Sequence, residues 1–458
     1  MPPALFQPSG SKLSIYAITW PIFVESALQM FLRISDTFML SKVSDDAVAA
    51  VGVANQLVMF CVLIFSFISI GTTVVVSQFL GAGLNREIPR LTGAALAINF
   101  LSGIAISALV VAFGGPFLRL LGLDGTLLSL GRQYLAIAGG ALVVQALLTA
   151  VTSVIQAFGL TRQTMLVTIG MNIMNVCGNY LFIYGALGFP KLGVTGVAIS
   201  TACSQFAGLI VNLVLLRRTT GVRVTLPDFW RWKREHVGKV LKVGVPSSAV
   251  TLSYVANQFV ITAMIATLGA QMLAAKIYTQ NIMFVVMILA GSLGRGVQII
   301  VGRLIGAGRL EEAYRQVLLN LARSVVITLA GVSVLCLARV PLLRLFTQEP
   351  AIIALGATLL LLSFLLEPGR NLNVIIERSL QAAGDARFPM WISIAVSWLF
   401  SLPLAYYLGI HREYGLIGFW SAFVVDEWLR GLILLIRWRS KSWTGHSLVS
   451  GEGTHTAG

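Results

Sequence analysis

The chain carries one pattern twice, at a constant spacing of 225 residues, and this repeat limits the possible folds more than any other feature. Pro21 recurs as Pro246, a Gly-Ala-Gly run at 81–83 recurs at 306–308, and a Gln-Ala-x-Gly run at 156–159 recurs at 381–384. The register holds without an insertion from Pro21 to Met165. Two homologous halves are mainly a device of membrane transporters when the chain is hydrophobic.

The composition places the repeat in a membrane. Hydrophobic residues make up 57% of the chain and charged residues only 11%, whereas a soluble domain has about a quarter of its residues charged. A span needs about 20 largely apolar residues. Twelve such segments occur, and all are expected to be helices: 14–40, 47–80, 90–114, 127–156, 163–186, 193–216, 240–267, 272–304, 314–338, 352–380, 388–410 and 416–436.

The helix count predicts the domain organisation. Six helices per half is an even number, so each helix and its copy cross the bilayer in the same direction, and the halves are parallel repeats with a cleft between two lobes. We expect an N-lobe over 1–216, a cytoplasmic linker over 217–238, a C-lobe over 239–440 and a disordered tail over 441–458. The fold class is therefore an all-α membrane protein of twelve transmembrane helices in two parallel six-helix repeats.

The positive charge fits this topology. Lys and Arg gather in the loops on the side of the termini, with a dense stretch from Arg217 to Lys242, and cytoplasmic loops collect such residues. Both termini are thus expected in the cytoplasm. The net charge of +15 needs no nucleic-acid partner.

Several classes of activity lack their motifs. The chain has no GxxxxGK[ST], HExxH or GxSxG sequence, so ATP-driven transport by this chain and the usual hydrolases are disfavoured. The four cysteines show no metal-binding spacing. We expect no enzyme activity and no cofactor, and transport would run on an ion gradient.

Acidic and amide residues inside the first lobe are the main candidates for coupling. Asp36 lies on the first helix, and a carboxylate at membrane depth is a functional candidate by default, able to switch between protonated and cation-binding states. Asn175 and Asn179 share one helical face and could coordinate a cation or bond Asp36. Glu25 lies one turn after Pro21 and has no acidic copy in the second half. The alternatives are a structural pairing of Asp36 with Arg33 and amide bonds between helices.

The second lobe supplies candidates for lining a substrate cleft. Charged residues at helical spacing could face the cleft or neutralise one another, and static pairing is favoured for the residues 377 and 426. Aromatic and methionine side chains could accept apolar guests. The candidates are Tyr254, Tyr278, Met283, Arg295, Glu367, Arg370, Glu377 and Asp426.

Two stretches of the first half carry a family resemblance. Pro21, the run Ser-Asp-Thr-Phe-Met-Leu at 35–40 and the run Asp-Ala-Val-Ala-Ala-Val-Gly at 46–52 resemble the first two helices of multidrug and toxic compound extrusion (MATE) transporters. The run from Asn175 to Gly185 is similar to the fifth helix of that family, and the repeated Gly-Ala-Gly and Gln-Ala-x-Gly elements fit as well. The resemblance covers most of residues 12–438.

The resemblance implies a V-shaped, two-lobe transporter in the bacterial inner membrane. It implies export of organic, often cationic or aromatic, small molecules by alternating access, in exchange for H+ or Na+. Asp36 would hold the coupling cation, and would be the Na+ ligand if coupling uses sodium, with Asn175 and Asn179 in the same network. Several family members have a carboxylate on the seventh helix, but nothing acidic lies between Gly244 and Ala275.

The remaining partners and rival functions are few. Membrane lipid is expected as surroundings, and a monomer as the assembly. The rivals are a flippase for lipid-linked oligosaccharides, which would need several cleft cations to hold pyrophosphate, and a membrane receptor or scaffold that does not transport.

Overall fold

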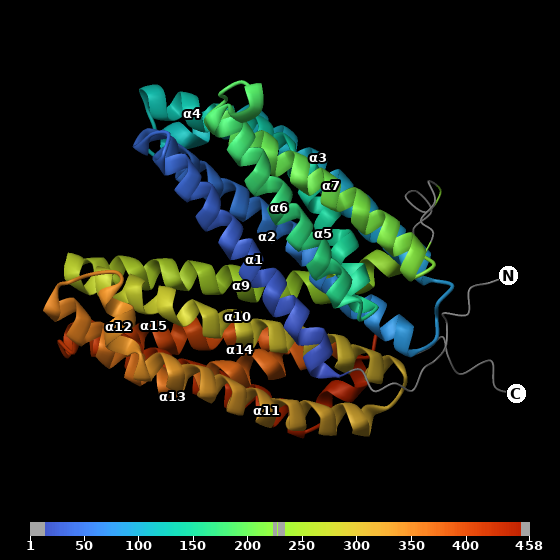
Figure 1. Cartoon of the computed structure of the whole chain (residues 1–458). Helices are drawn as coiled ribbons and strands as arrows, with labels where there is room; N and C mark the ends of the chain where they lie inside the picture. The colour runs from blue at the N-terminus through green and yellow to red at the C-terminus, as the bar shows by residue number, and fades with distance from the viewer. Residues whose placement is uncertain (1–13, 223–226, 228–233, 450–458) are drawn as a thin grey trace, which may run out of the picture. The chain divides into compact units, whose positions relative to one another are not determined.

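The computed structural model describes residues 14–222, 227 and 234–449. By backbone contacts the chain divides into a first unit, Met1–Gly244, and a second unit, Val245–Gly458. Within the described residues the elements are helical. Figure 1 labels the helices of each unit.

The first unit is built from long apolar helices. Its elements are α1 (Ile15–Ser41), α2 (Asp45–Gly81), α3 (Ile88–Leu120), α4 (Gly125–Gly140), α5 (Leu142–Ala157), α6 (Thr161–Tyr184), the short η1 (Ala186–Gly188), α7 (Val194–Thr219) and the beginning of α9 (Arg234–Ala266). Helix α1 packs against α6, which packs against α7, and α5 contacts α2, α3 and α7. Helix α5 is thus the central helix of this unit.

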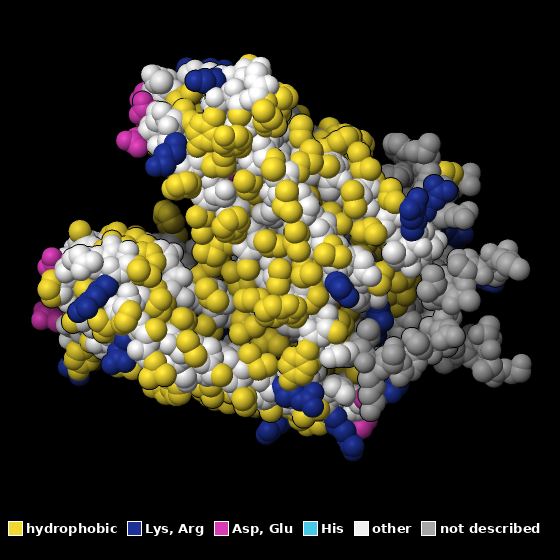
Figure 2. Space-filling model, in the orientation of Figure 1, with side chains coloured by type: hydrophobic (Ala, Val, Ile, Leu, Met, Phe, Trp, Pro, Cys, Tyr) yellow, Lys and Arg dark blue, Asp and Glu magenta, His cyan; other side chains and the backbone are white. Residues whose placement is uncertain are grey.

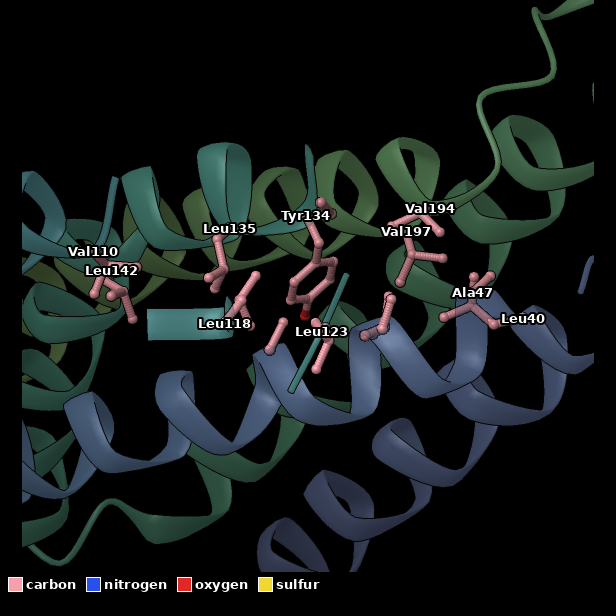
Figure 3. Close-up of a cluster of buried hydrophobic side chains, with 14 of the residues drawn as sticks. Leu40, Ala47, Val110, Leu118, Leu123, Tyr134, Leu135, Leu142, Val194 and Val197 are labelled. Carbon is pink, nitrogen blue, oxygen red and sulfur yellow. The ribbon is translucent and has the colours of Figure 1, made fainter. Parts of the chain in front are cut away.

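The span predicted over 127–156 is broken in the structure. Helices α4 and α5 meet at Ala141 with a bend of 42°. Two glycines, Gly139 and Gly140, precede the bend, and glycine pairs are common sites of helix kinks. The break lies beside the apolar cluster in which α2, α3, α4 and α7 meet, where Tyr134 is 5% exposed. Figure 3 shows the Tyr134 ring among leucine and valine side chains of this cluster.

The second unit repeats the plan with local departures, since the continuous α13 takes the place of the bent α4–α5 pair. After α9 come α10 (Ala270–Gly306), α11 (Leu310–Leu337), the short α12 (Arg339–Arg344) and α13 (Pro350–Ala382). The span predicted over 388–410 is a composite of α14 (Arg387–Ala395), the π-helical η2 (Val396–Ser401), α15 (Leu402–Tyr406) and the π-helical η3 (Tyr407–His411). Pro403 lacks a backbone donor, which disrupts regular α-helical bonding here. Helix α16 (Gly415–Arg439) completes the set, and α13 packs against α10, α11 and α16.

The membrane spans correspond to the predicted segments. Among the described residues, ten helices are long and apolar enough to cross a membrane, and the bent α4–α5 pair makes an eleventh. Helix α16 corresponds to the twelfth predicted segment and has Asp426, Glu427 and Arg430 near its middle. In Figure 2 apolar side chains cover the long sides of the helices, and charged ones gather near the helix ends.

The predicted disordered tail is corrected in its first part. Residues 442–446 form η4 (Ser442–His446), and Trp443 is 1% exposed because its ring stacks on Trp438 at 4.2 Å. The Trp443 Nε1 also donates to the Trp438 carbonyl at 2.9 Å. The sequence predicts disorder here because this stretch lacks a periodic pattern of apolar residues, and such a pattern does not report aromatic stacking or an indole hydrogen bond. Residues 450–458, and residues 223–226 and 228–233 of the predicted linker, lie outside the described residues.

Candidate functional site

A line of polar side chains crosses the interior of the first unit. Asn179 Nδ2 donates to Asp36 Oδ1 at 2.6 Å and to Asn175 Oδ1 at 3.0 Å. Asn175 Nδ2 in turn donates to Thr201 Oγ1 on α7 at 3.0 Å. Three helices, α1, α6 and α7, are thereby joined through four side chains. The spacing of four between the two asparagines places them on one face of α6, as the sequence predicts.

The oxygens of this line are available for a cation. Both amide hydrogens of Asn179 are used by acceptors, and Asn179 Oδ1 is buried without a hydrogen-bond partner in the described part of the chain. Asn179 and Asn175 are 0% exposed, whereas Asp36 is half-buried. A carboxylate oxygen and an unsatisfied amide oxygen therefore lie in one line, and both are acceptor groups of the kind that hard cations prefer as ligands.

The geometry does not support the alternative in which Asp36 pairs with Arg33. Arg33 is exposed, and no described ion pair joins it to Asp36. Tyr134 from α4 lies close enough to interact electrostatically with Asp36, and its hydroxyl donates to Asn55 Oδ1 at 2.9 Å. The neighbours of Asp36 are therefore neutral polar groups.

Asn172 and Glu25 lie apart from this line. Asn172 Nδ2 bonds its own helix at Thr168 O, at 2.8 Å. Glu25 is 7% exposed, and its Oε2 accepts from Gln156 Nε2 at 3.1 Å and from Thr164 Oγ1 at 3.0 Å. Glu25 thus ties α1 to α5 and α6 through a second polar cluster. Its partner Gln156 belongs to the repeated Gln-Ala-x-Gly element. The sequence shows that this element is repeated, but it does not show the contact with Glu25.

The acids of the second unit form a paired network. Arg370 Nη1 lies 2.5 Å from Glu367 Oε1, and Arg370 Nε lies 3.3 Å from Glu427 Oε1. Arg430 Nη2 lies 2.5 Å from Asp426 Oδ2 and 3.1 Å from Glu427 Oε2. Three acids and two arginines of α13 and α16 therefore neutralise one another to a net charge of −1 when all are ionised. Glu427 and Arg430 are central to the network although neither stood among the predicted site residues.

The other predicted cleft residues occupy different surroundings. Glu377 accepts from Gln381 Nε2 at 2.7 Å within α13; Gln381 is the repeat copy of Gln156, but its acceptor lies on its own helix, whereas Gln156 bonds Glu25 on α1. Tyr254 on α9 interacts electrostatically with Arg370 and Glu427. Tyr278 stacks on Phe346 at 5.2 Å, and Met283 is 3% exposed within the cluster of α10, α11 and α13. The side chain of Arg295 is exposed.

One buried charge of the second unit was missed by the sequence interpretation. Lys276 on α10 is 2% exposed and bonds Thr262 Oγ1 on α9. The feature of the sequence that could have indicated it is a single lysine inside the long apolar segment 272–304.

The comparisons with known proteins decide the family. The MatE family model matches residues 21–181 and 246–407, one match in each half of the repeat. The chain belongs to the MATE family of multidrug efflux transporters. It is 41% identical to the uncharacterized transporter YisQ of Bacillus subtilis over 96% of this chain and 97% of that protein.

More distant relatives agree with this assignment. The MATE chain is 24% identical to the probable multidrug resistance protein NorM of Thermotoga maritima, over 96% of this chain and 95% of that one. Its structure matches a crystal structure of MATE in the bent conformation with a TM-score of 0.86, at 20% identity, over 93% of this chain and 94% of that one. The predicted family and the all-α transporter fold are therefore confirmed, and the protein is a multi-pass membrane transporter of small molecules.

Proposed function

We propose that this MATE protein is a cation-coupled antiporter that exports organic, often cationic or aromatic, compounds across the bacterial inner membrane in exchange for H+ or Na+. The observation that carries the proposal is the Asp36–Asn179–Asn175 line. It puts a carboxylate with neutral partners inside a membrane-spanning unit, where a permanently unpaired charge is costly. Uptake of a proton or a sodium ion relieves that cost.

The coupling follows from differential affinity. A cation shifts a conformational equilibrium only if it binds one state more tightly than the other. Because the line joins α1, α6 and α7, a cation at Asp36 changes the bonds between these helices. We propose that the cation-bound packing favours the state that releases substrate outward. Both termini are taken to lie in the cytoplasm, following the distribution of Lys and Arg.

The charge arrangement disfavours the flippase alternative. A pyrophosphate site would require several free cationic groups, whereas Arg370 and Arg430 are engaged by acids of α13 and α16 and Lys276 is a single amine. A receptor or scaffold would have no use for the half-buried Asp36 carboxylate. Antiport remains the function that these residues support best, and we propose that the protein acts as a monomer.

The test is efflux from proteoliposomes with imposed pH and sodium gradients in turn, with a fluorescent cationic dye as substrate. The wild-type protein is expected to move the dye under at least one gradient, and Asp36→Asn to abolish the gradient dependence because the neutral amide cannot exchange a proton or neutralise Na+. Asp124→Asn is the matched control, since Asp124 is exposed and caps no backbone group. Full gradient-driven efflux by Asp36→Asn at equal reconstitution would refute the role.

Asn179→Ala tests the contribution of the Asn179 amide separately from that of the Asp36 carboxylate. It removes the hydrogen bond to Asp36 and the free Oδ1 together. Hydrogen bonds to charged groups contribute about 1.5–3 kcal/mol, and this one favours the ionised carboxylate. With H+ as the coupling ion its loss should therefore raise the apparent proton affinity roughly 10- to 100-fold, whereas with Na+ as the coupling ion the loss of the Oδ1 ligand should make the affinity for Na+ fall. Asn172→Ala, which removes only a bond within α6, should leave either affinity unchanged.

A further inference from the structure

Lys276 is a buried cation in an apolar part of the second unit. It is 2% exposed and follows Ala275, a member of the apolar cluster that also contains Ile261 and Phe419. Charged side chains are rare inside membrane spans and usually pair with an acid or line a transport path. A lysine at this position therefore needs a partner or a task.

The partner is a single hydroxyl. Lys276 Nζ donates to Thr262 Oγ1, which itself donates to the Gln258 carbonyl at 2.6 Å. An ammonium has three donors and no acceptor, yet in the described part of the chain this is the one hydrogen bond recorded for it. Thr279, one turn further along α10, is 0% exposed and its Oγ1 lacks a hydrogen-bond partner among the described residues.

In the part of the chain that the structure describes, no opposite charge compensates the amine. The charged residues at this end of the unit are Arg339 and Arg344 on α12, Glu349 before α13, and Arg412 and Glu413 before α16. Arg339 bonds the Cys336 carbonyl, and the other four are exposed. Among the described residues none forms an ion pair with Lys276.

The repeat gives this lysine its context. Thr262 is the copy of Thr37, and the residue before it, Ile261, is the copy of Asp36. Lys276 itself is the copy of Val51. At the level where the first unit has an acid among neutral polar groups, the second unit has a base bonded to a neutral polar group.

We propose that Lys276 is a second proton-binding site of the transport cycle, which takes up H+ as an amine and releases it from the ammonium. The proposal rests on the antiport function above. The step forms and breaks one N–H bond, and the nitrogen lone pair holds or loses the proton. Both forms can donate to Thr262, because the neutral amine keeps two hydrogens, so proton release sacrifices no hydrogen bond. Since only 2% of Lys276 is exposed, the proton is retained in this conformation and exchanges when the unit changes its packing.

Two substitutions fix the two charge states. Lys276→Met is permanently neutral and fits the apolar site, and Lys276→Arg is permanently charged because the guanidinium does not deprotonate in proteins. Lys42→Met is the matched control, since Lys42 is exposed after α1. Lys276→Gln serves as a second neutral variant if the methionine protein does not purify as a single species.

The experiment measures dye efflux from sodium-free proteoliposomes between pH 6 and pH 9, and protons released when the dye is added to purified protein, with pyranine as reporter. We expect both Lys276 variants to lose one limb of the wild-type pH profile and to release one proton fewer per transporter. Lys42→Met should match the wild type in both measurements.

The other outcomes overturn the proposal. Wild-type pH profiles and proton release in both variants would show that Lys276 keeps one charge state. A requirement of wild-type efflux for chloride, abolished in Lys276→Met and kept in Lys276→Arg, would make it an anion site. Wild-type protein without dye efflux under any gradient would contradict the antiport function itself, and the inference with it.

Discussion

Loss of Arg430 should strongly destabilise the second unit, because this residue holds two buried carboxylates at once. Its Nε and Nη2 bond Asp426 Oδ2 at 3.0 and 2.5 Å, and its Nη2 lies 3.1 Å from Glu427 Oε2. Arg430 and Glu427 are each 5% exposed, and Asp426 is 7% exposed. Arg430→Met keeps an unbranched side chain of good helical preference and removes the guanidinium with its charge and donors.

The expected size follows from the charges that remain. The substitution changes the network from three acids and two arginines to three acids and Arg370 alone. Removing one partner of a buried pair costs about 3–5 kcal/mol, so we expect a loss of that order in the free energy of unfolding. Asp426→Asn acts in the opposite sense, because it leaves two acids with two arginines and an amide oxygen that still accepts. Its cost should be about 1 kcal/mol, the value of an ordinary hydrogen bond.

The assay is unfolding of each purified variant by increasing mole fraction of sodium dodecyl sulfate in mixed micelles, followed by tryptophan fluorescence. Asp426→Asn should also keep dye efflux close to the wild-type rate, because in this interpretation the carboxylate stabilises α13 and α16 and binds no substrate. Equal stability of the two variants would refute the reasoning. Abolished efflux in a stable Asp426→Asn protein would move Asp426 from the structural network to the substrate path.

Two further predictions concern packing. Gly71→Ala should destabilise the first unit by about 1–3 kcal/mol in the same unfolding assay, because the new Cβ would lie 2.1 Å from the Val240 carbonyl oxygen. The control Gly52→Ala should be close to neutral, because no atom lies within 4 Å of its new Cβ. An equal effect of the two substitutions would contradict the close approach of α2 and α9. Trp443→Ala should cost about 3–5 kcal/mol and expose Trp438 to water-soluble fluorescence quenchers, and unchanged quenching would mean that η4 does not cover that ring.

The sequence predicts the helices better than their irregularities. Hydropathy locates the spans because a helix must bury or expose about 20 apolar residues to lipid, and α16 was found despite its charges because apolar residues surround them. The bend at Ala141 was missed, since a kink leaves the apolar pattern intact. The composite α14–η3 helix was missed as well, because π-helical turns depend on local bonding around Pro403.

Side-chain partners follow a similar rule. Asn175 and Asn179 were predicted together because a spacing of four within one helix fixes a shared face. The bond from Gln156 to Glu25 joins residues 131 positions apart, and only the packing of α1 on α5 and α6 brings them together. Thr201 and Lys276 were missed for the same reason. The role of a single hydroxyl or lysine can be assigned only when the side chains around it are known.

The duplicated backbone and the unduplicated polar residues together argue for a division of tasks. The repeat preserves the positions that shape helices, such as Pro21 and Pro246, because both units must solve the same packing problem in lipid. The polar positions are free to diverge, since the hydrogen bonds and ion pairs named above for the buried charges lie within one unit. The first unit keeps an acid without an ion pair, the second keeps its acids neutralised by arginines, and its uncompensated charge is a base. Two sites of opposite charge can each respond to the proton gradient without competing for a metal ion, because a buried ammonium repels Na+ where a carboxylate attracts it. On this argument, sodium would act through Asp36 alone, whereas protons would act through both units.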